Sequence, residues 1–108
     1  MKKNILVTGA AGFLGSYFCE LLSKNDYNII GLDKNKKTVK SLNRKFKKLN
    51  IQNANFFTVD ISNEKKIIEF KKKIKKQRIK INYLINNAAI DTAPKKSQKA
   101  LINFPKVE

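Results

Sequence analysis

Four short apolar runs constrain this chain more than any other feature of its sequence. We expect each of them to form a buried β-strand, and they occupy residues 4–8, 28–33, 54–60 and 81–86. The segments between the runs carry apolar residues at helical spacing. Strands that alternate with helices are typical of a parallel sheet with right-handed crossovers and helices on both faces. The sequence therefore predicts an α/β fold, a doubly wound parallel sheet that stops after its fourth strand, with strand order 3-2-1-4.

Three helices are predicted between the strands. The first begins at Phe13, ends near residues 23–26 and carries at helical spacing Leu14, Tyr17, Phe18, Leu21 and Leu22. The second covers residues 35–49 and places on one face Val39, Leu42, Phe46 and Leu49. The third runs to about Arg78, with Ser62 or Asn63 as its expected N-cap.

Three of the four glycines lie between the first run and the first helix, as Gly9, Gly12 and Gly15. A helix N-terminus presents free N–H groups and the positive end of the helix dipole, and both favour a bound phosphate. We predict that Gly9 makes a tight turn, that Gly12 lets the backbone approach a pyrophosphate, and that Gly15 lets the helix pack against the strand. Small residues also serve ordinary helix packing. A strand before the glycines, and a helix and second strand after them, favour a dinucleotide site.

Two acidic residues follow neighbouring strands at the edge where this turn lies. Asp33 ends the second run, and we expect its carboxylate to accept hydrogen bonds from adenosine ribose hydroxyls and to repel a 2′-phosphate. Asp60 ends the third run, where Asp60 and Ile61 could flank an adenine ring. Each aspartate could instead cap a helix or close a turn. Together with the glycine turn they favour a dinucleotide site, with NAD expected and NADP less favoured.

The charge and composition exclude several other classes. The net charge is +16, but 22 of the 24 basic residues are lysine, without interleaved aromatics, so nucleic acid is not the expected partner. No run is long enough to span a membrane, and we expect a cytoplasmic protein. The chain has no histidine and one cysteine, Cys19, which excludes histidine-based catalysis and a multi-cysteine metal site, so no metal ligands are expected.

The motifs together resemble the short-chain dehydrogenase/reductase family, in the part that forms its Rossmann-like, NAD(P)-binding half. The residues that carry the resemblance are "TGAAGFLG" (8–15), Asp33, "VDI" (59–61) and "NNAA" (86–89). In the family the "NNAG"-type motif ends the fourth strand and borders the cofactor, and here alanine replaces its last glycine. The resemblance implies a cofactor site formed by Gly9, Ala11, Gly12, Phe13, Leu14, Gly15, Asp33, Asp60, Ile61, Asn87, Ala88 and Ala89.

The resemblance also implies an activity, the transfer of hydride between nicotinamide and a carbonyl or alcohol substrate. The approach to "NNAA" is similar to the smaller oxidoreductase branch, which we favour, and "NNAAID" is similar to members that act on sugars. The glycine spacing is more typical of the extended branch, which epimerises or dehydrates nucleotide sugars. A fragment of such an enzyme is therefore one alternative, and a stand-alone nucleotide-binding module is another.

Catalysis in this family depends on a tyrosine with a lysine four residues later. Tyr17, Tyr27 and Tyr83 are followed at that spacing by Leu21, Gly31 and Asn87, so no catalytic residue is expected in this chain. We expect residues 1–90 to form the cofactor-binding half, and residues 91–108 to be a loop that stops before the catalytic half. A small-molecule substrate, and assembly as a homo-oligomer, are then expectations for a full-length version.

Overall fold

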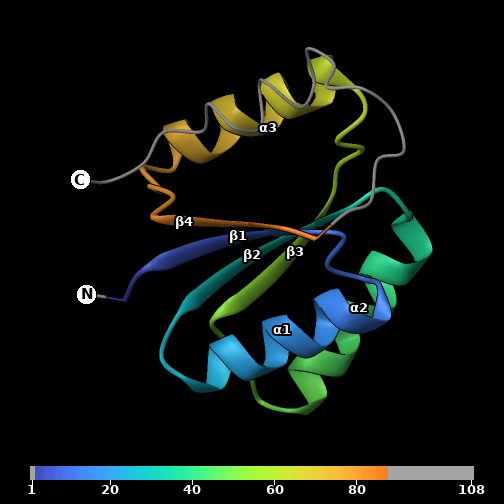
Figure 1. The fold of residues 1–108 in the computed structure, drawn as a ribbon, viewed down its shortest axis with the longest axis vertical. Helices are drawn as coiled ribbons and strands as arrows, with labels where there is room; N and C mark the ends of the chain where they lie inside the picture. The colour runs from blue at the N-terminus through green and yellow to red at the C-terminus, as the bar shows by residue number, and fades with distance from the viewer. Residues whose placement is uncertain (1, 88–108) are drawn as a thin grey trace.

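The computed structural model describes residues 2–87, which form one parallel sheet with helices on both of its faces (Figure 1). The strands are β1 (Asn4–Thr8), β2 (Asn28–Asp33), β3 (Ala54–Thr58) and β4 (Tyr83–Asn86). The helices between them are α1 (Phe13–Lys24), α2 (Lys36–Lys48) and α3 (Glu64–Lys76). All neighbouring strands pair in parallel in the order β3-β2-β1-β4, which confirms the predicted fold class and strand order.

The element bounds differ from the predicted ones mainly at the third and fourth strands. β3 ends at Thr58, so Asp60 lies two residues beyond the strand rather than at its last position. β4 begins at Tyr83, although the predicted run starts at Ile81. The tail predicted over residues 91–108 lies outside the described residues.

Two apolar cores lie on opposite faces of the sheet. The α3 side buries Leu6, Ile30 and Leu32 of the strands against Ile67, Phe70 and Ile74. The other side, covered by α1 and α2, buries alternate residues of the same strands, including Ile5, Val7 and Ile29. Successive side chains of a strand point to opposite faces of the sheet, so a strand that is buried on both faces has apolar residues at successive positions. This explains why the strands appear as continuous apolar runs in the sequence.

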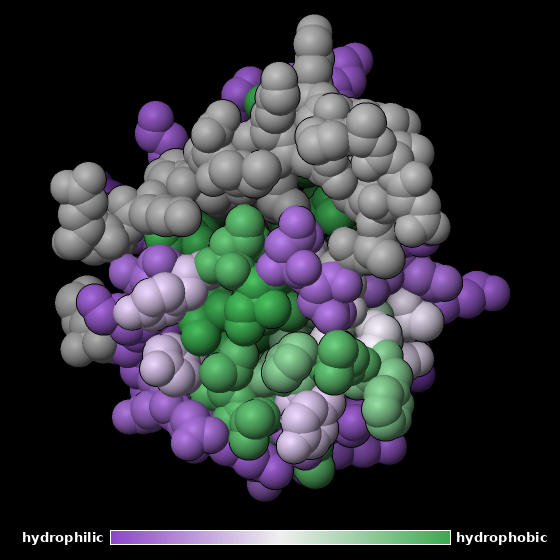
Figure 2. Space-filling model, in the orientation of Figure 1, coloured by the Kyte–Doolittle hydropathy of each residue, from purple (hydrophilic) through white to green (hydrophobic). Residues whose placement is uncertain are grey.

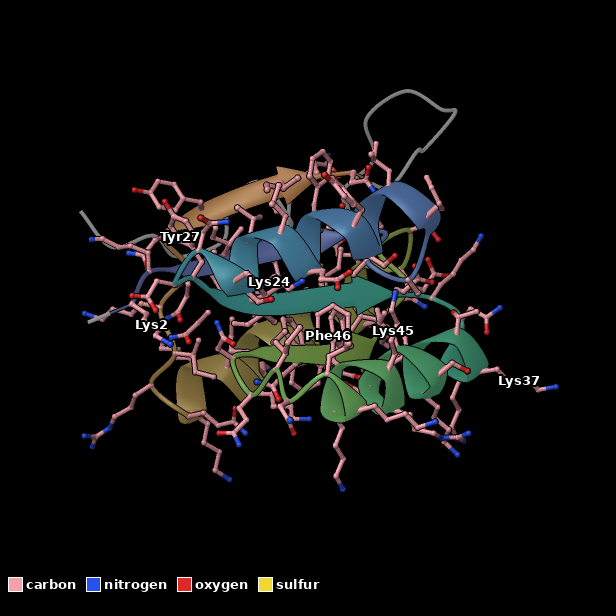
Figure 3. All side chains as sticks on the ribbon, turned by 90° about the horizontal axis from the view of Figure 1, so that it is seen from below. Lys2, Lys24, Tyr27, Lys37, Lys45 and Phe46 are labelled. Atoms are coloured by element: carbon pink, nitrogen blue, oxygen red, sulfur yellow. The ribbon has the colours of Figure 1, made fainter. Side chains whose placement is uncertain are left out.

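Helix α2 has the amphipathic pattern predicted for it. Val39, Leu42 and Phe46 are buried, whereas Leu49, at the C-cap, remains 46% exposed. Figure 3 shows Phe46 between α2 and the sheet, while Lys37 extends away from the molecule. The lysines of this helix thus form a solvated outer face.

Helix α1 does not face the sheet with the side that carries most of its large apolar residues. Its buried residues are the small Gly15, Cys19 and Ser23, which let the helix lie close to the sheet. Four larger apolar residues are exposed, namely Phe13, Leu14, Tyr17 and Leu21, whereas Leu22 is partly buried against the core. Figure 2 shows hydrophobic side chains gathered on the face of the molecule where α1 and β4 lie. The spacing predicted the helix correctly, but it did not show which side of the helix faces the sheet.

Candidate functional site

The glycine turn connects β1 to α1 at the carboxyl edge of the sheet. Gly9 follows the last residue of β1 and has φ 64°, in the left-handed region that glycine occupies without a steric penalty. The N–H of Gly12 donates to the Gly9 carbonyl over 3.2 Å, and the N–H of Ser16 donates to the Gly12 carbonyl over 2.9 Å. Gly9 therefore makes the tight turn predicted for it, and Gly12 is the N-cap that immediately precedes α1.

The three glycines of the turn meet different constraints from the fold. A Cβ on Gly15 would collide with the Gly9 carbonyl oxygen and would lie 2.9 Å from the Asn87 side-chain nitrogen. A Cβ on Gly12 would lie 3.4 Å from the Gly9 carbonyl oxygen, an ordinary contact, and its φ of −72° suits any residue. The fold therefore accounts for glycine at positions 9 and 15, whereas it would accept a side chain at position 12.

The N-terminus of α1 carries no side-chain cap. Gly12 occupies the N-cap position without a side-chain hydrogen bond, and the first turn contains no acidic residue. The two residues that follow Gly12 are open to solvent, with Phe13 95% exposed and Leu14 52% exposed. The first N–H groups of a helix have no partner inside the helix. This end of α1 thus offers backbone donors and the positive end of the helix dipole to a ligand.

Asp33, the last residue of β2, ties two segments together. Its Oδ2 accepts a hydrogen bond from the backbone N–H of Ala11 in the glycine turn, over 3.1 Å. Its Oδ1 accepts one from the N–H of Asn35, over 3.1 Å. The N-cap of α2 is Asn35, so Asp33 closes the turn before the helix rather than capping it. The structure thus brings Asp33 to the glycine turn, as its place at the end of the second run predicts.

Asp60 is part of a local turn that precedes α3. Its Oδ1 accepts hydrogen bonds from the Ser62 hydroxyl over 2.7 Å and from the Ser62 N–H over 2.9 Å. These bonds lower the pKa of the Asp60 carboxyl, the hydroxyl contributing most, and the positive charge of Lys34 lowers it further. Asn63 is the N-cap of α3, one of the two caps predicted. Ile61 is 8% exposed and belongs to the core beneath α3, so its predicted contact with adenine stays a prediction.

The end of β4 lies against the same turn. The side-chain amide of Asn87 donates to the Gly9 carbonyl over 3.3 Å. The hydroxyl of Thr8 donates to the Asn86 side-chain oxygen over 2.9 Å, which joins the ends of β1 and β4. The predicted site did not include Thr8 or Asn86, although a polar residue at the end of an apolar run is the signal that could have identified them. Ala88 and Ala89 lie outside the described residues.

The described part of the chain was also compared with the requirements of a metal site and of a reactive cysteine. Residues 2–87 hold no group of histidine, cysteine, aspartate or glutamate side chains that could bind a metal ion. Burial raises the pKa of the Cys19 thiol to about 12, as expected for a packed residue rather than a nucleophile. Among the described helices, none is long and apolar enough to span a membrane.

The parallel order β3-β2-β1-β4, the glycine turn after β1 and the aspartate after β2 define a Rossmann-like half. Residues 3–104 match the family model described as short chain dehydrogenase. The chain belongs to the short-chain dehydrogenase family, whose full-length members are NAD(P)-dependent oxidoreductases.

Three comparisons show how far the similarity extends. The chain is 36% identical over 89 residues to the 3-oxoacyl-(acyl-carrier-protein) reductase FabG of Buchnera aphidicola, covering 82% of this chain and 35% of that protein. It is 61% identical over 31 residues, 28% of this chain and 10% of the relative, to a Bacillus subtilis protein described as the uncharacterized UDP-glucose epimerase YtcB. The crystal structure of 2-keto-3-deoxy-D-gluconate dehydrogenase from Streptococcus agalactiae superposes with a TM-score of 0.73 at 29% identity, over 85% of this chain and 35% of that chain. This chain therefore spans about a third of the length of FabG and of that dehydrogenase.

Proposed function

We propose that this chain is the cofactor-binding part of an NAD-dependent oxidoreductase, which transfers hydride between nicotinamide and a carbonyl or alcohol substrate. The observation that carries the proposal is at Gly12. The fold would accept a side chain there, yet the residue is glycine, and it lies at the uncapped N-terminus of α1. A pyrophosphate that must approach the backbone closely explains both features, because a Cβ would obstruct it and a cap would occupy its donors.

The residues of the turn fit a dinucleotide pyrophosphate. The backbone N–H groups of Phe13 and Leu14, which follow Gly12, would donate to its oxygens, while Gly9 and Gly15 hold the turn in place. No side chain is required for these contacts. The exposed ring of Phe13 and the methyl groups of Leu14 would therefore cover the ligand rather than form hydrogen bonds to it. Asn87, Ala88 and Ala89 would border the cofactor on the β4 side.

Asp33 and Asp60 would form the adenosine end of the site. A carboxylate can accept about four hydrogen bonds, and Asp33 uses two of these positions for Ala11 and Asn35. Its remaining positions can accept the ribose hydroxyls of NAD, whereas the 2′-phosphate of NADP would face a like charge. Lys34, which is exposed beside Asp33, would reduce this preference by attracting the phosphate.

Calorimetric titration of the chain with NAD and NADP tests the proposal. We expect NAD to bind at least about tenfold more tightly than NADP. We expect Gly12→Val to weaken NAD binding by about tenfold or more, because valine occupies the place of the pyrophosphate. The matched control is Thr38→Val, in the exposed first turn of α2, which should leave the affinity unchanged. A chain that binds no NAD, or binds it equally well after Gly12→Val, would contradict the proposal.

A nucleotide-sugar epimerase or dehydratase is the second candidate for the full-length protein. It is favoured by the spacing of Gly9, Gly12 and Gly15 and by the 61% identity to YtcB over 31 residues. The two candidates share the NAD site and differ in what happens to the hydride. A full-length version that oxidises NADH with added ketones supports the oxidoreductase, whereas one that converts UDP-glucose without net NADH oxidation supports the epimerase. No tyrosine in this chain has a lysine four residues later, so we expect the chain alone to turn over no NADH.

A further inference from the structure

The segment between Gly9 and Gly12 is held to β2 by two hydrogen bonds. The N–H of Ala10 donates to the Leu32 carbonyl over 3.0 Å, which extends the backbone pairing of β1 with β2 beyond Thr8. The N–H of Ala11 donates to Oδ2 of Asp33 over 3.1 Å. The first of these bonds is between backbone groups, so it is available to any sequence. The second depends on the side chain of Asp33 alone.

The hydrogen bond from Ala11 to Asp33 restrains a segment of backbone that its neighbouring glycines make flexible. Ala11 lies next to Gly12 and two residues after Gly9, and glycines give this segment more conformational freedom than other residues would. A hydrogen bond to a carboxylate is stronger than one between neutral groups, and Ala11 is half-buried, so its N–H would be left poorly solvated without the bond. The Asp33 carboxylate is itself fixed, because its other oxygen accepts from Asn35 at the start of α2.

We propose that Asp33 is a positioning residue of the glycine turn, in addition to the ribose contact given to it above. It holds Ala11 so that Gly12 and the end of α1 have their binding geometry before a nucleotide arrives. This inference rests on the proposed dinucleotide site. The positioning role and the ribose contact predict different results for nucleotides that have no ribose hydroxyls. If Asp33 positions the turn, loss of its side chain should weaken the binding of these nucleotides too. An Asp33 that acted only on the ribose would leave such binding unchanged, or would improve it once its negative charge was removed.

Amide hydrogen exchange at Ala11, measured by NMR on the unliganded chain, tests the anchor without any ligand. We expect Asp33→Ala to raise the exchange rate of this amide by about tenfold or more. Asp26→Asn is the matched control, because it removes one negative charge from an exposed site that is bonded to Lys2 and not to the glycine turn. Asp26 has φ 73°, a conformation that asparagine tolerates, so the control should fold normally. An unchanged rate in Asp33→Ala would overturn the proposal.

Titration with ADP and with 2′,3′-dideoxy-ADP then tests whether the anchor serves binding. The dideoxy compound retains the pyrophosphate and lacks both hydroxyls that Asp33 could contact. We expect Asp33→Ala to bind it about threefold to tenfold more weakly than the parent chain does, while Asp26→Asn binds it as the parent does. Equal or tighter binding by Asp33→Ala would overturn the inference and leave the dinucleotide site intact. Failure of the parent chain to bind ADP would contradict the proposed function instead, and the exchange rate at Ala11 would still decide the anchor.

Discussion

The N-terminus of α1 differs from those of α2 and α3, although each of the three helices connects one strand of the parallel sheet to the next strand along the chain. Helix α2 is capped by Asn35, whose side-chain oxygen accepts from the N–H groups of Lys37 and Thr38, over 3.1 and 3.2 Å. Helix α3 is capped by Asn63, which accepts from the N–H of Lys66 over 3.2 Å. Helix α1 has Gly12 at its N-cap position and therefore no side-chain cap. The chain thus satisfies these backbone donors at two helices and leaves them available at the third.

The difference indicates that stability alone did not select the residue at the start of α1. A side-chain cap stabilises a helix by about 1 kcal/mol relative to alanine and by a few tenths of a kcal/mol relative to glycine, and the backbone at Gly12, with φ −72° and ψ 168°, would suit a capping residue. Helix α1 instead depends on its packing against the sheet through Gly15 and Cys19. A phosphate ligand would supply the missing acceptor, so the proposed site would account for the absence of a cap.

The largest effect is expected from Gly15→Ala. The added Cβ would collide with the Gly9 carbonyl oxygen, which is backbone and cannot move aside cheaply. We expect the free energy of unfolding to fall by about 3 kcal/mol, the upper range for overpacking, with loss of NAD binding as the turn shifts. Urea denaturation followed by circular dichroism measures the free energy of unfolding. A variant as stable as the parent would show that α1 does not pack as closely on the turn as the structure has it.

Gly31→Ala should destabilise the fold, and its added Cβ would press on both the core and Ala10 of the glycine turn. A Cβ on Gly31, in the middle of β2, would collide with the Phe56 ring and lie 2.7 Å from the Ala10 Cβ. The ring can adjust in part, so we expect a loss of about 2 kcal/mol. The affinity for NAD, measured below the unfolding transition, should change less than it does in Gly12→Val. A larger loss of affinity in Gly31→Ala than in Gly12→Val would show that the position of the turn matters more to the ligand than the absence of a side chain at Gly12.

Removing the caps of the other two helices should have a smaller and purely structural effect. We expect Asn35→Ala and Asn63→Ala each to lower the free energy of unfolding by about 1 kcal/mol, because backbone donors lose their acceptor. Neither change should alter NAD affinity by more than about twofold, well under the 1.4 kcal/mol of a tenfold change. Thermal denaturation and calorimetry on the same samples provide both values. An Asn63→Ala variant with strongly reduced NAD affinity would indicate that the ligand binds at α3. This result would contradict the distinction between the open end of α1 and the capped ends of α2 and α3.

Much of the fold was predictable because it depends on periodic burial. The runs at β1 and β2 are buried on both faces, and their predicted bounds match the structure. The face of α1 was less predictable, because close packing selected the small Gly15, Cys19 and Ser23 rather than the large apolar residues. Sequence periodicity detects large apolar side chains on one face, but it does not detect a contact surface made of small ones.

The candidate site was predictable where it depends on strand ends and not where it depends on turn geometry. The place of Asp33 beside the glycine turn follows from strand order, because the carboxyl ends of neighbouring parallel strands meet at one edge. Its bond to Ala11 depends on where the turn places one N–H group, which no residue spacing specifies. Likewise, the sequence alone does not distinguish the three glycines of the turn. The structure does so, because the backbone angle of Gly9 and the packing around Gly15 require glycine, whereas Gly12 has room for a side chain.

The most direct test of the account is Gly12→Ser, with unfolding free energy and NAD affinity measured on the same protein. Serine at the N-cap would give α1 the side-chain acceptor that α2 and α3 already have. The account predicts that the free energy of unfolding stays the same or rises by a few tenths of a kcal/mol, since serine caps slightly better than glycine. It also predicts that NAD binds about tenfold more weakly or worse, because the side chain takes the place and the donors of the pyrophosphate. A variant that is more stable and binds NAD as tightly as the parent chain would contradict the claim that this helix end is kept open for a ligand.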